Sequence, residues 1–167
     1  MRTTNTDVVK NGMWLIVPIL GFSLVLMDRL PAALTPALFN KDIPDLLLLG
    51  ENVGRIFLFG LPSLFALGIS TRTQKWGLAL YGVGVATYFL SYLAQIVLPD
   101  SAWSTSMAGF VATAYTNLTW IIGLGLLGER FYFTNRVRYH PVFYLAPAFV
   151  FLVFHITHAV VVYQRTF

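Results

Sequence analysis

Four ionisable side chains, Glu51, Arg55, His155 and His158, lie inside stretches of sequence that are otherwise strongly apolar. Residues 46–62 read LLLLGENVGRIFLFGLP, so a carboxylate and a guanidinium stand four positions apart within an apolar segment. In a helix, this spacing with the glutamate first is the favourable order for an internal ion pair. Ionisable groups at membrane depth are energetically costly and tend to mark a functional site.

Two interpretations of the Glu51 and Arg55 pair remain open from the sequence. In the first, the two side chains form a structural ion pair near the membrane boundary and simply satisfy each other. In the second, Arg55 anchors an anionic head group, or Glu51 accepts a proton. The sequence alone does not decide between a structural and a functional pair.

The two histidines are three positions apart, which places His155 and His158 on one face of a helix. Such a pair can ligate a metal together, and Glu51 would complete a three-ligand site with an open position for water. Histidines in membrane helices also serve only as hydrogen-bonding groups between helices. We therefore expect no metal, with a site made of His155, His158 and Glu51 as the alternative. The sequence does not identify a cofactor.

The composition is that of an integral membrane protein. Hydrophobic residues make up 57% of the chain and charged residues 11%, whereas about a quarter of the residues in soluble domains are charged. The formal net charge is +4, but most Lys and Arg residues lie between apolar runs, where they orient a membrane protein, so we expect no nucleic-acid partner. Cysteine is absent, and no Walker loop, dinucleotide fingerprint, HExxH motif or nucleophile elbow is present.

The apolar runs predict an all-α integral membrane protein, a bundle of five transmembrane helices that forms a single domain over residues 1–167. Three prolines in residues 30–44 exclude one continuous helix there. The second predicted helix is longer than a hydrocarbon core of about 30 Å, so it must tilt, kink or project, and Pro62 supplies a kink. The predicted helices span residues 13–27, 45–69, 76–98, 107–127 and 141–163.

Polar and small residues follow one face of the third and fourth predicted helices. In a membrane bundle such a stripe points inward, so two stripes on consecutive helices imply a shared interior. On the second helix, Gly50 and Gly54 have the spacing that favours close contact between helices. The stripes consist of Tyr81, Gly84, Tyr88, Ser91, Tyr92 and Gln95, followed by Gly109, Thr113, Thr116, Asn117, Trp120 and Gly123.

The distribution of Lys and Arg predicts the orientation of the bundle, because these residues concentrate on the cytoplasmic side. Seven lie on one side and three on the other. The amino terminus is therefore predicted in the cytoplasm and the carboxyl terminus outside, in a multi-pass protein of a cytoplasmic (inner) or plasma membrane. The first group is Arg2, Lys10, Arg72, Lys75, Arg130, Arg136 and Arg138, and the second is Arg29, Lys41 and Arg165.

This orientation brings polar residues from four helices into the outer half of the bundle. If the stripes point inward, these side chains border one cavity, where an amphiphile would place its head group on Arg55 and the histidines. The candidate ligand-binding residues are Glu51, Arg55, Tyr88, Tyr92, Gln95, Asn117, His155 and His158.

Three functions of different kinds fit these features. The first is a receptor, carrier or enzyme for a small amphiphile such as a lipid, quinone or pigment-like molecule. The second is an accessory or structural subunit of a larger membrane complex, and the third is a proton or ion pathway. Membrane lipids are expected partners in each case, together with other membrane subunits or a second copy of the chain. Whether the protein is an enzyme stays open.

Overall fold

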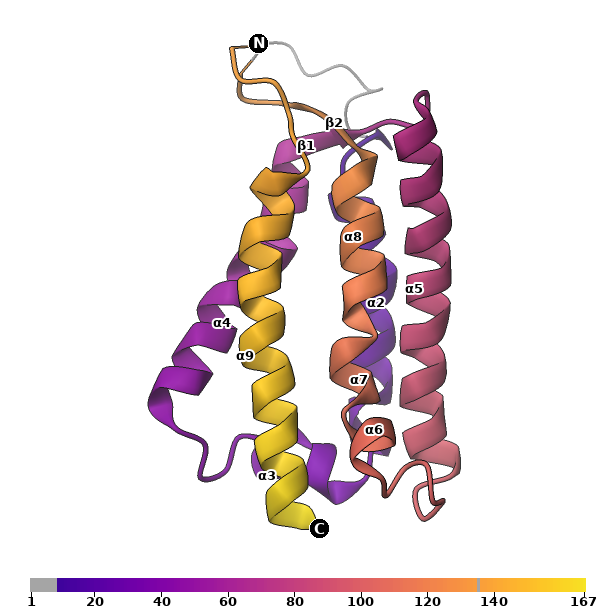
Figure 1. Ribbon diagram of the computed structural model, residues 1–167, viewed down its shortest axis with the longest axis vertical. Helices are drawn as coiled ribbons and strands as arrows, with labels where there is room; N and C mark the ends of the chain where they lie inside the picture. Colours follow the sequence, from indigo (N-terminus) through magenta and orange to yellow (C-terminus); the bar gives the residue numbers. More distant parts are fainter. Residues whose placement is uncertain (1–8, 135) are drawn as a thin grey trace.

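The computed structural model describes residues 9–134 and 136–167, and helices dominate it (Figure 1). Three helical segments are long and apolar enough to cross a membrane, namely Asp45–Leu64, Arg72–Val97 and Val142–Thr166. A fourth apolar segment, Ala112–Leu127, is shorter. The prediction of a mainly helical chain compatible with a membrane is therefore confirmed. Arg2, which enters the predicted charge count, lies outside the described residues.

The helical stretches lie side by side and run alternately in opposite directions (Figure 1). The connection between α2 and α4 is built from short turns and a single helical turn, α3. The longer elements are α2 (Met13–Leu26), α4 (Asp45–Gly60), α5 (Arg72–Val97), α8 (Asn117–Leu127) and α9 (Val142–Thr166). The shorter ones are η1 (Met27–Arg29), η2 (Ala32–Leu34), α3 (Pro36–Phe39), η3 (Leu61–Leu64), β1 (Phe65–Leu67), α6 (Met107–Phe110), α7 (Ala112–Tyr115) and β2 (Gly128–Phe131).

The predicted helix over residues 45–69 was too long. The α-helix ends at Gly60, and the chain continues as the 3-10 turn η3 and the strand β1. Pro62 has no N–H group to continue the helical ladder, and Phe65 is extended, with φ of −133° and ψ of 151°. Pro62 therefore helps to end this helix, where a kink was predicted.

The predicted helix over residues 107–127 is divided into α6, α7 and α8. Polar side chains at the breaks bond to backbone carbonyls of the preceding turn, and such bonds compete with the helical ladder. Thr116 donates its hydroxyl to the carbonyl of Ala112 at 2.6 Å. Asn117 donates its amide to the carbonyls of Thr113 and Ala114 at 3.0 and 2.9 Å.

A two-stranded antiparallel sheet closes the end of the bundle where α5 begins (Figure 1). Strands β1 and β2 pair Phe65 with Phe131 and Ala66 with Arg130, and Asn11 forms a bridge to Ala66. This sheet was not predicted. It joins the chain just before α2 to the chain after α4 and after α8, so three helix ends are connected on one side.

Glycines bring the helices into close contact in pairs. A Cβ atom added at Gly84 of α5 would lie 2.2 Å from the backbone nitrogen of Trp120 in α8. A Cβ atom at Gly54 of α4 would lie 2.8 Å from the Cβ atom of Phe151 in α9. The predicted close contact at Gly50 and Gly54 is therefore confirmed, since a side chain at Gly50 would also collide with Phe154.

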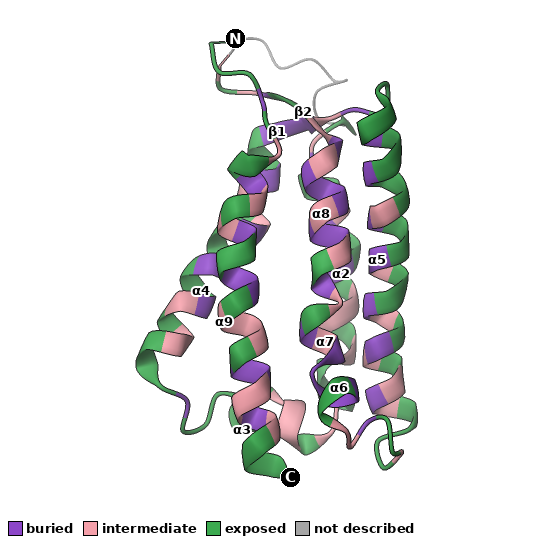
Figure 2. Ribbon diagram, viewed as in Figure 1, coloured by how far each residue is buried: buried purple, intermediate pink, exposed green. Residues whose placement is uncertain are grey.

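The inward faces of the helices are buried and the outward faces are exposed (Figure 2). On α5, the predicted stripe lies inward, because Tyr81, Gly84, Tyr88, Ser91 and Gln95 are buried. Large apolar side chains cover the outward surface, as expected for contact with lipid tails. They include Leu46, Leu49 and Ile56 of α4, Val83 and Leu90 of α5, and Val150 and Val153 of α9.

Candidate functional site

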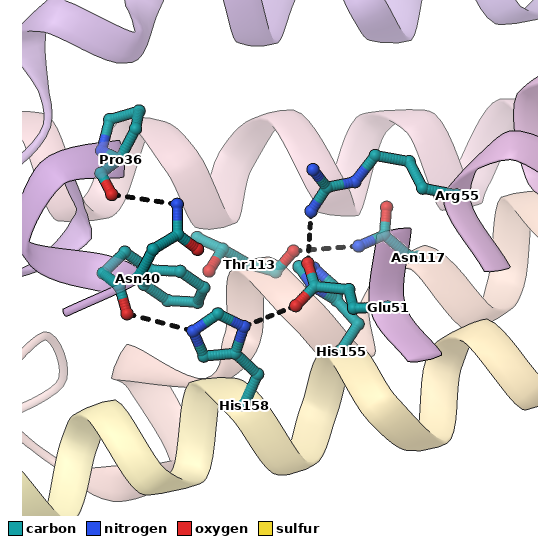
Figure 3. A network of polar contacts seen from close by, with 9 residues as sticks. Pro36, Asn40, Glu51, Arg55, Thr113, Asn117, His155 and His158 are labelled. Atoms are coloured by element: carbon teal, nitrogen blue, oxygen red, sulfur yellow. Dashed lines mark hydrogen bonds and ion pairs between the residues drawn. The ribbon is translucent and has the colours of Figure 1, made fainter. Parts of the chain in front are cut away.

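The carboxylate of Glu51 lies at the centre of a buried polar cluster between α4 and α9 (Figure 3). Only 2% of the Glu51 side chain is exposed. Arg55, one helical turn later, donates to Oε1, which confirms the predicted ion pair. Nδ1 of His155 lies 3.0 Å from Oε1, and Nδ1 of His158 contacts Oε2. Three basic side chains therefore share one carboxylate.

The close approach of α4 and α9 explains why these residues meet. Gly50 and Gly54 flank Glu51 along the helix, and neither places a side chain between the two backbones. His155 and His158 lie on the face of α9 that packs against this stretch of α4, as their spacing of three residues predicts. The sequence therefore positions the cluster through local spacing on each helix and small residues at the contact.

His158 also holds the connection between α2 and α4. Its side chain is fully buried, and its Nε2 donates to the carbonyl oxygen of Phe39 at 3.0 Å. The rings of Phe39 and His158 lie 4.1 Å apart between centroids. Near the end of α9, Arg165 donates to the carbonyls of Leu38, at 2.6 Å, and Lys41. The segment 36–41 is thus attached to α9 at two places.

These bonds engage all three residues of the alternative metal site, Glu51, His155 and His158. Both ring nitrogens of His158 are engaged, one by the carboxylate and one by the backbone carbonyl. A metal ligand needs a free lone pair directed at the ion. Across residues 9–134 and 136–167, no group of three or more His, Cys, Asp or Glu residues is arranged to hold a metal ion.

A cavity of about 300 Å³ lies beside the cluster, which is at the lower end of the range for small-molecule sites. Elements from the whole chain enclose it, including α2, α4, α5, α8, α9 and the segment around α3. Its lining contains both polar side chains and apolar or aromatic ones. The apolar part includes Ile19, Leu20, Leu30, Leu34, Phe39, Leu58, Phe59, Trp120 and Phe151.

Most of the predicted site residues meet at this cavity, and two do not line it. Glu51, Arg55, Tyr88, Tyr92, Asn117 and His155 form part of the wall, together with Ser23 and Thr113. His158 contacts Oε2 of Glu51 without lining the cavity itself. Gln95 serves another purpose, because its amide donates to the carbonyl of Gly109 at 2.9 Å and so connects α5 to α6.

Several polar groups on the wall are already bonded within the protein. Asn117 donates to two carbonyls of α7 and accepts from the indole of Trp120 at 2.8 Å. The hydroxyl of Tyr88 lies 2.7 Å from that of Ser23. Because Ser23 donates its proton to the carbonyl of Ile19, Tyr88 is the donor in this bond. These groups therefore build the wall and offer little to a ligand.

Arg55 and His155 have bonding capacity left. The side chain of Arg55 is 47% exposed, and among the described residues its guanidinium bonds only to Glu51. His155 is 20% exposed, and its Nε2 has no bonding partner within the described part of the chain. A ligand in the cavity would therefore find a cation and an imidazole nitrogen on the same wall.

Comparison with protein-family models, with curated proteins and with solved structures finds no match to this chain. A fold by itself does not define a function, which depends on the chemistry of a site. The function is therefore inferred below from the geometry of the cluster and of the cavity beside it.

Proposed function

We propose that this chain is a multi-pass membrane protein that binds a small amphiphilic molecule, such as a lipid, a quinone or a pigment-like compound, in the cavity beside Glu51 and Arg55. The observation that carries this proposal is the mixed lining of the cavity. A half-exposed guanidinium and an imidazole, both with bonding capacity left, line it together with many aromatic and aliphatic side chains. Such a lining matches a molecule with a polar end and an apolar remainder.

The proposal includes five membrane crossings, with the amino terminus in the cytoplasm. Besides the three long helices, residues 13–29 of α2 and η1 and residues 107–127 of α6 to α8 fall within the roughly 17 to 25 residues that a crossing needs. The alternating direction of the helices supports this count (Figure 1). The sheet then lies on the cytoplasmic side, in an inner or plasma membrane, and the cavity lies in the outer half.

The two other functions have less support. A proton or ion pathway would need polar continuity from Glu51 towards the basic loops, but Ile121, Leu124 and Leu127 fill the interior along α8. An accessory subunit would have its polar stripes filled by neighbouring helices. This holds where α5 packs on α8, yet the cavity beside Arg55 stays open.

The thermal stability of the purified chain in a neutral detergent tests the proposal. Single-chain lipids, quinones and divalent metal ions would each be added. A molecule present at about 100 times its Kd should stabilise the native state by roughly 2.7 kcal/mol. This effect should be largely lost in Arg55→Gln and in His155→Ala, and kept in the control Arg72→Gln, which changes an arginine at the start of α5. Stabilisation that survives both site substitutions would contradict the proposal.

A further inference from the structure

The two hydrogen bonds of His158 fix the number of protons in the buried cluster. The carbonyl oxygen of Phe39 can only accept a hydrogen bond, so Nε2 of His158 carries a proton. On the other side of the ring, Nδ1 faces Oε2 of Glu51, and two lone pairs in contact would repel each other. One proton therefore lies between these two atoms.

This proton makes Glu51 and His158 an electrically neutral pair. If the proton is on the ring, an imidazolium faces a carboxylate. If it is on the oxygen, a neutral imidazole faces a carboxylic acid. The sum of the two charges is zero in both arrangements, so Glu51 cannot also neutralise Arg55, although Arg55 donates to its other oxygen.

The cluster as a whole then carries one positive charge. Arg55 is always protonated, and a neutral His155 satisfies its contact with Glu51 by donating from Nδ1. Protonation of His155 would add a further positive charge. Among the described residues, no other Asp, Glu, Lys or Arg lines the cavity, and the other titratable groups there are the phenols of Tyr88 and Tyr92. The charge of Arg55 is therefore uncompensated at the cavity wall.

We infer that the cavity binds a single-chain amphiphile with a carboxylate head group, which places one negative charge on Arg55. This inference rests on the proposed function and specifies the chemical class of its ligand. The guanidinium presents its N–H groups in a planar fork that matches a carboxylate, and charge-assisted bonds of this kind are strong. A cavity of about 300 Å³ favours a ligand with one alkyl chain over a two-chain phospholipid.

The experiment compares three ligands that share one chain and differ in head group. Dodecanoate, dodecanol and dodecylamine would be titrated into the full chain in neutral detergent, and Kd measured for each. Dodecanoate should bind about tenfold more tightly than dodecanol, and dodecylamine should bind most weakly. In Arg55→Gln, dodecanoate should lose its advantage over dodecanol.

Glu51→Gln supplies a second test of the charge count. The glutamine amide can donate to Nδ1 of a neutral His158, so the cluster keeps one positive charge and dodecanoate should keep its advantage. If Glu51 instead neutralised Arg55, the same substitution would expose a new positive charge and increase the advantage. An increase would overturn the inference.

The outcomes for the unmodified protein separate this inference from the proposed function. Equal binding of dodecanoate and dodecanol would overturn the inference that the ligand has a carboxylate head group. The proposed binding site for an amphiphile would still stand. Binding confined to phosphatidylglycerol in nanodiscs would overturn the inference that the ligand is a single-chain amphiphile. Binding of none of these molecules, with no stabilisation by any quinone, would overturn the proposed function itself.

Discussion

The Nε2 atom of His158 lies 3.0 Å from the carbonyl oxygen of Phe39, a residue 119 positions earlier in the chain. This bond attaches the connection between α2 and α4 to the helix that also carries His155. Its donor is the ring whose other nitrogen contacts Glu51. One buried side chain therefore links the wall of the cavity to the segment that covers it.

Replacing His158 with leucine should destabilise the protein by about 2 to 4 kcal/mol, because Oε2 of Glu51 and the carbonyl oxygen of Phe39 each lose a hydrogen-bond partner. His155→Leu should cost less, since His155 is partly exposed and makes one bond to Glu51. Chemical denaturation in a mild detergent would measure both. Hydrogen exchange at residues 38–41 should accelerate only in His158→Leu. Equal losses in the two variants would contradict the central role of His158.

Gly54→Ala should destabilise the contact between α4 and α9 by about 1 to 3 kcal/mol, since the added methyl group would lie 2.8 Å from an atom of Phe151. Gly82→Ala is the matched control, because Gly82 is also helical and a Cβ atom there meets nothing within 4 Å. Gly82→Ala should stabilise the protein by about 0.5 to 1 kcal/mol, because alanine leaves the unfolded chain less conformational freedom than glycine does. Thermal unfolding of the two variants should shift in opposite directions. A Gly54→Ala variant that is as stable as the unmodified protein would show that the close approach is not needed.

Tyr144→Phe should leave stability unchanged or raise it. The hydroxyl of Tyr144 is buried and has no hydrogen-bond partner among the described residues, and such a group costs about 1 to 3 kcal/mol. Tyr81→Phe is the comparison, because the hydroxyl of Tyr81 donates to the carbonyl of Leu15 at 2.6 Å. Tyr81→Phe should lower the stability of the protein by roughly 1 kcal/mol. If Tyr144→Phe is the more harmful change, the Tyr144 hydroxyl has a partner in solution.

Alkaline pH should weaken the bundle through Tyr139, which lies before α9. Burial raises the pKa of its phenol above the ordinary value of 10.0, so the folded protein keeps the proton when the unfolded chain has lost it. The stabilisation is therefore complete below pH 10 and falls as the pH rises above it. Tyr139→Phe loses the bond to the carbonyl of Gly125, so it should be less stable at pH 8. The difference from the unmodified protein should narrow at pH 10.5, as measured by denaturation at both values. A constant difference would contradict this assignment.

The orientation can be tested with single cysteines, since the natural sequence has none. A cysteine at Arg136 should resist an impermeant thiol reagent in intact cells, and one at Asp100 should react. Both should react after the membrane is made permeable, which controls for accessibility. Labelling at position 136 alone would reverse the proposed topology.

The chemistry of the cluster was predictable because each part of it is encoded locally. The pairing of Glu51 with Arg55 follows from a spacing of four, and the shared face of His155 and His158 from a spacing of three. The contact between these two pairs of residues was expected because the alternating direction of the predicted helices places both pairs in the same half of the bundle. The alternating direction of the helices does not predict the role of each residue. Gln95, for example, belongs to the predicted stripe, but its amide bonds to a backbone carbonyl of α6.

The features that were missed depend on backbone atoms or on ambiguous apolar runs. The acceptor for His158 is a carbonyl, and every residue has one, so nothing in the side chain of Phe39 indicates it. Residues 65–67 continue an apolar run that reads as helix, and their extended form depends on pairing with residues 128–131. Contacts between distant short segments leave no periodic signal in a single sequence.

The sheet of β1 and β2 has a mechanical consequence for the cavity. It fixes the ends of α4 and α8 to each other and to the chain before α2, while Glu51 lies near the opposite end of α4. At that end α4 is attached to α9 by side chains, through the contacts of Glu51 with His155 and His158. A molecule that enters beside Arg55 thus meets contacts between side chains, which can rearrange while the backbone pairing of the sheet at the other end of α4 stays in place.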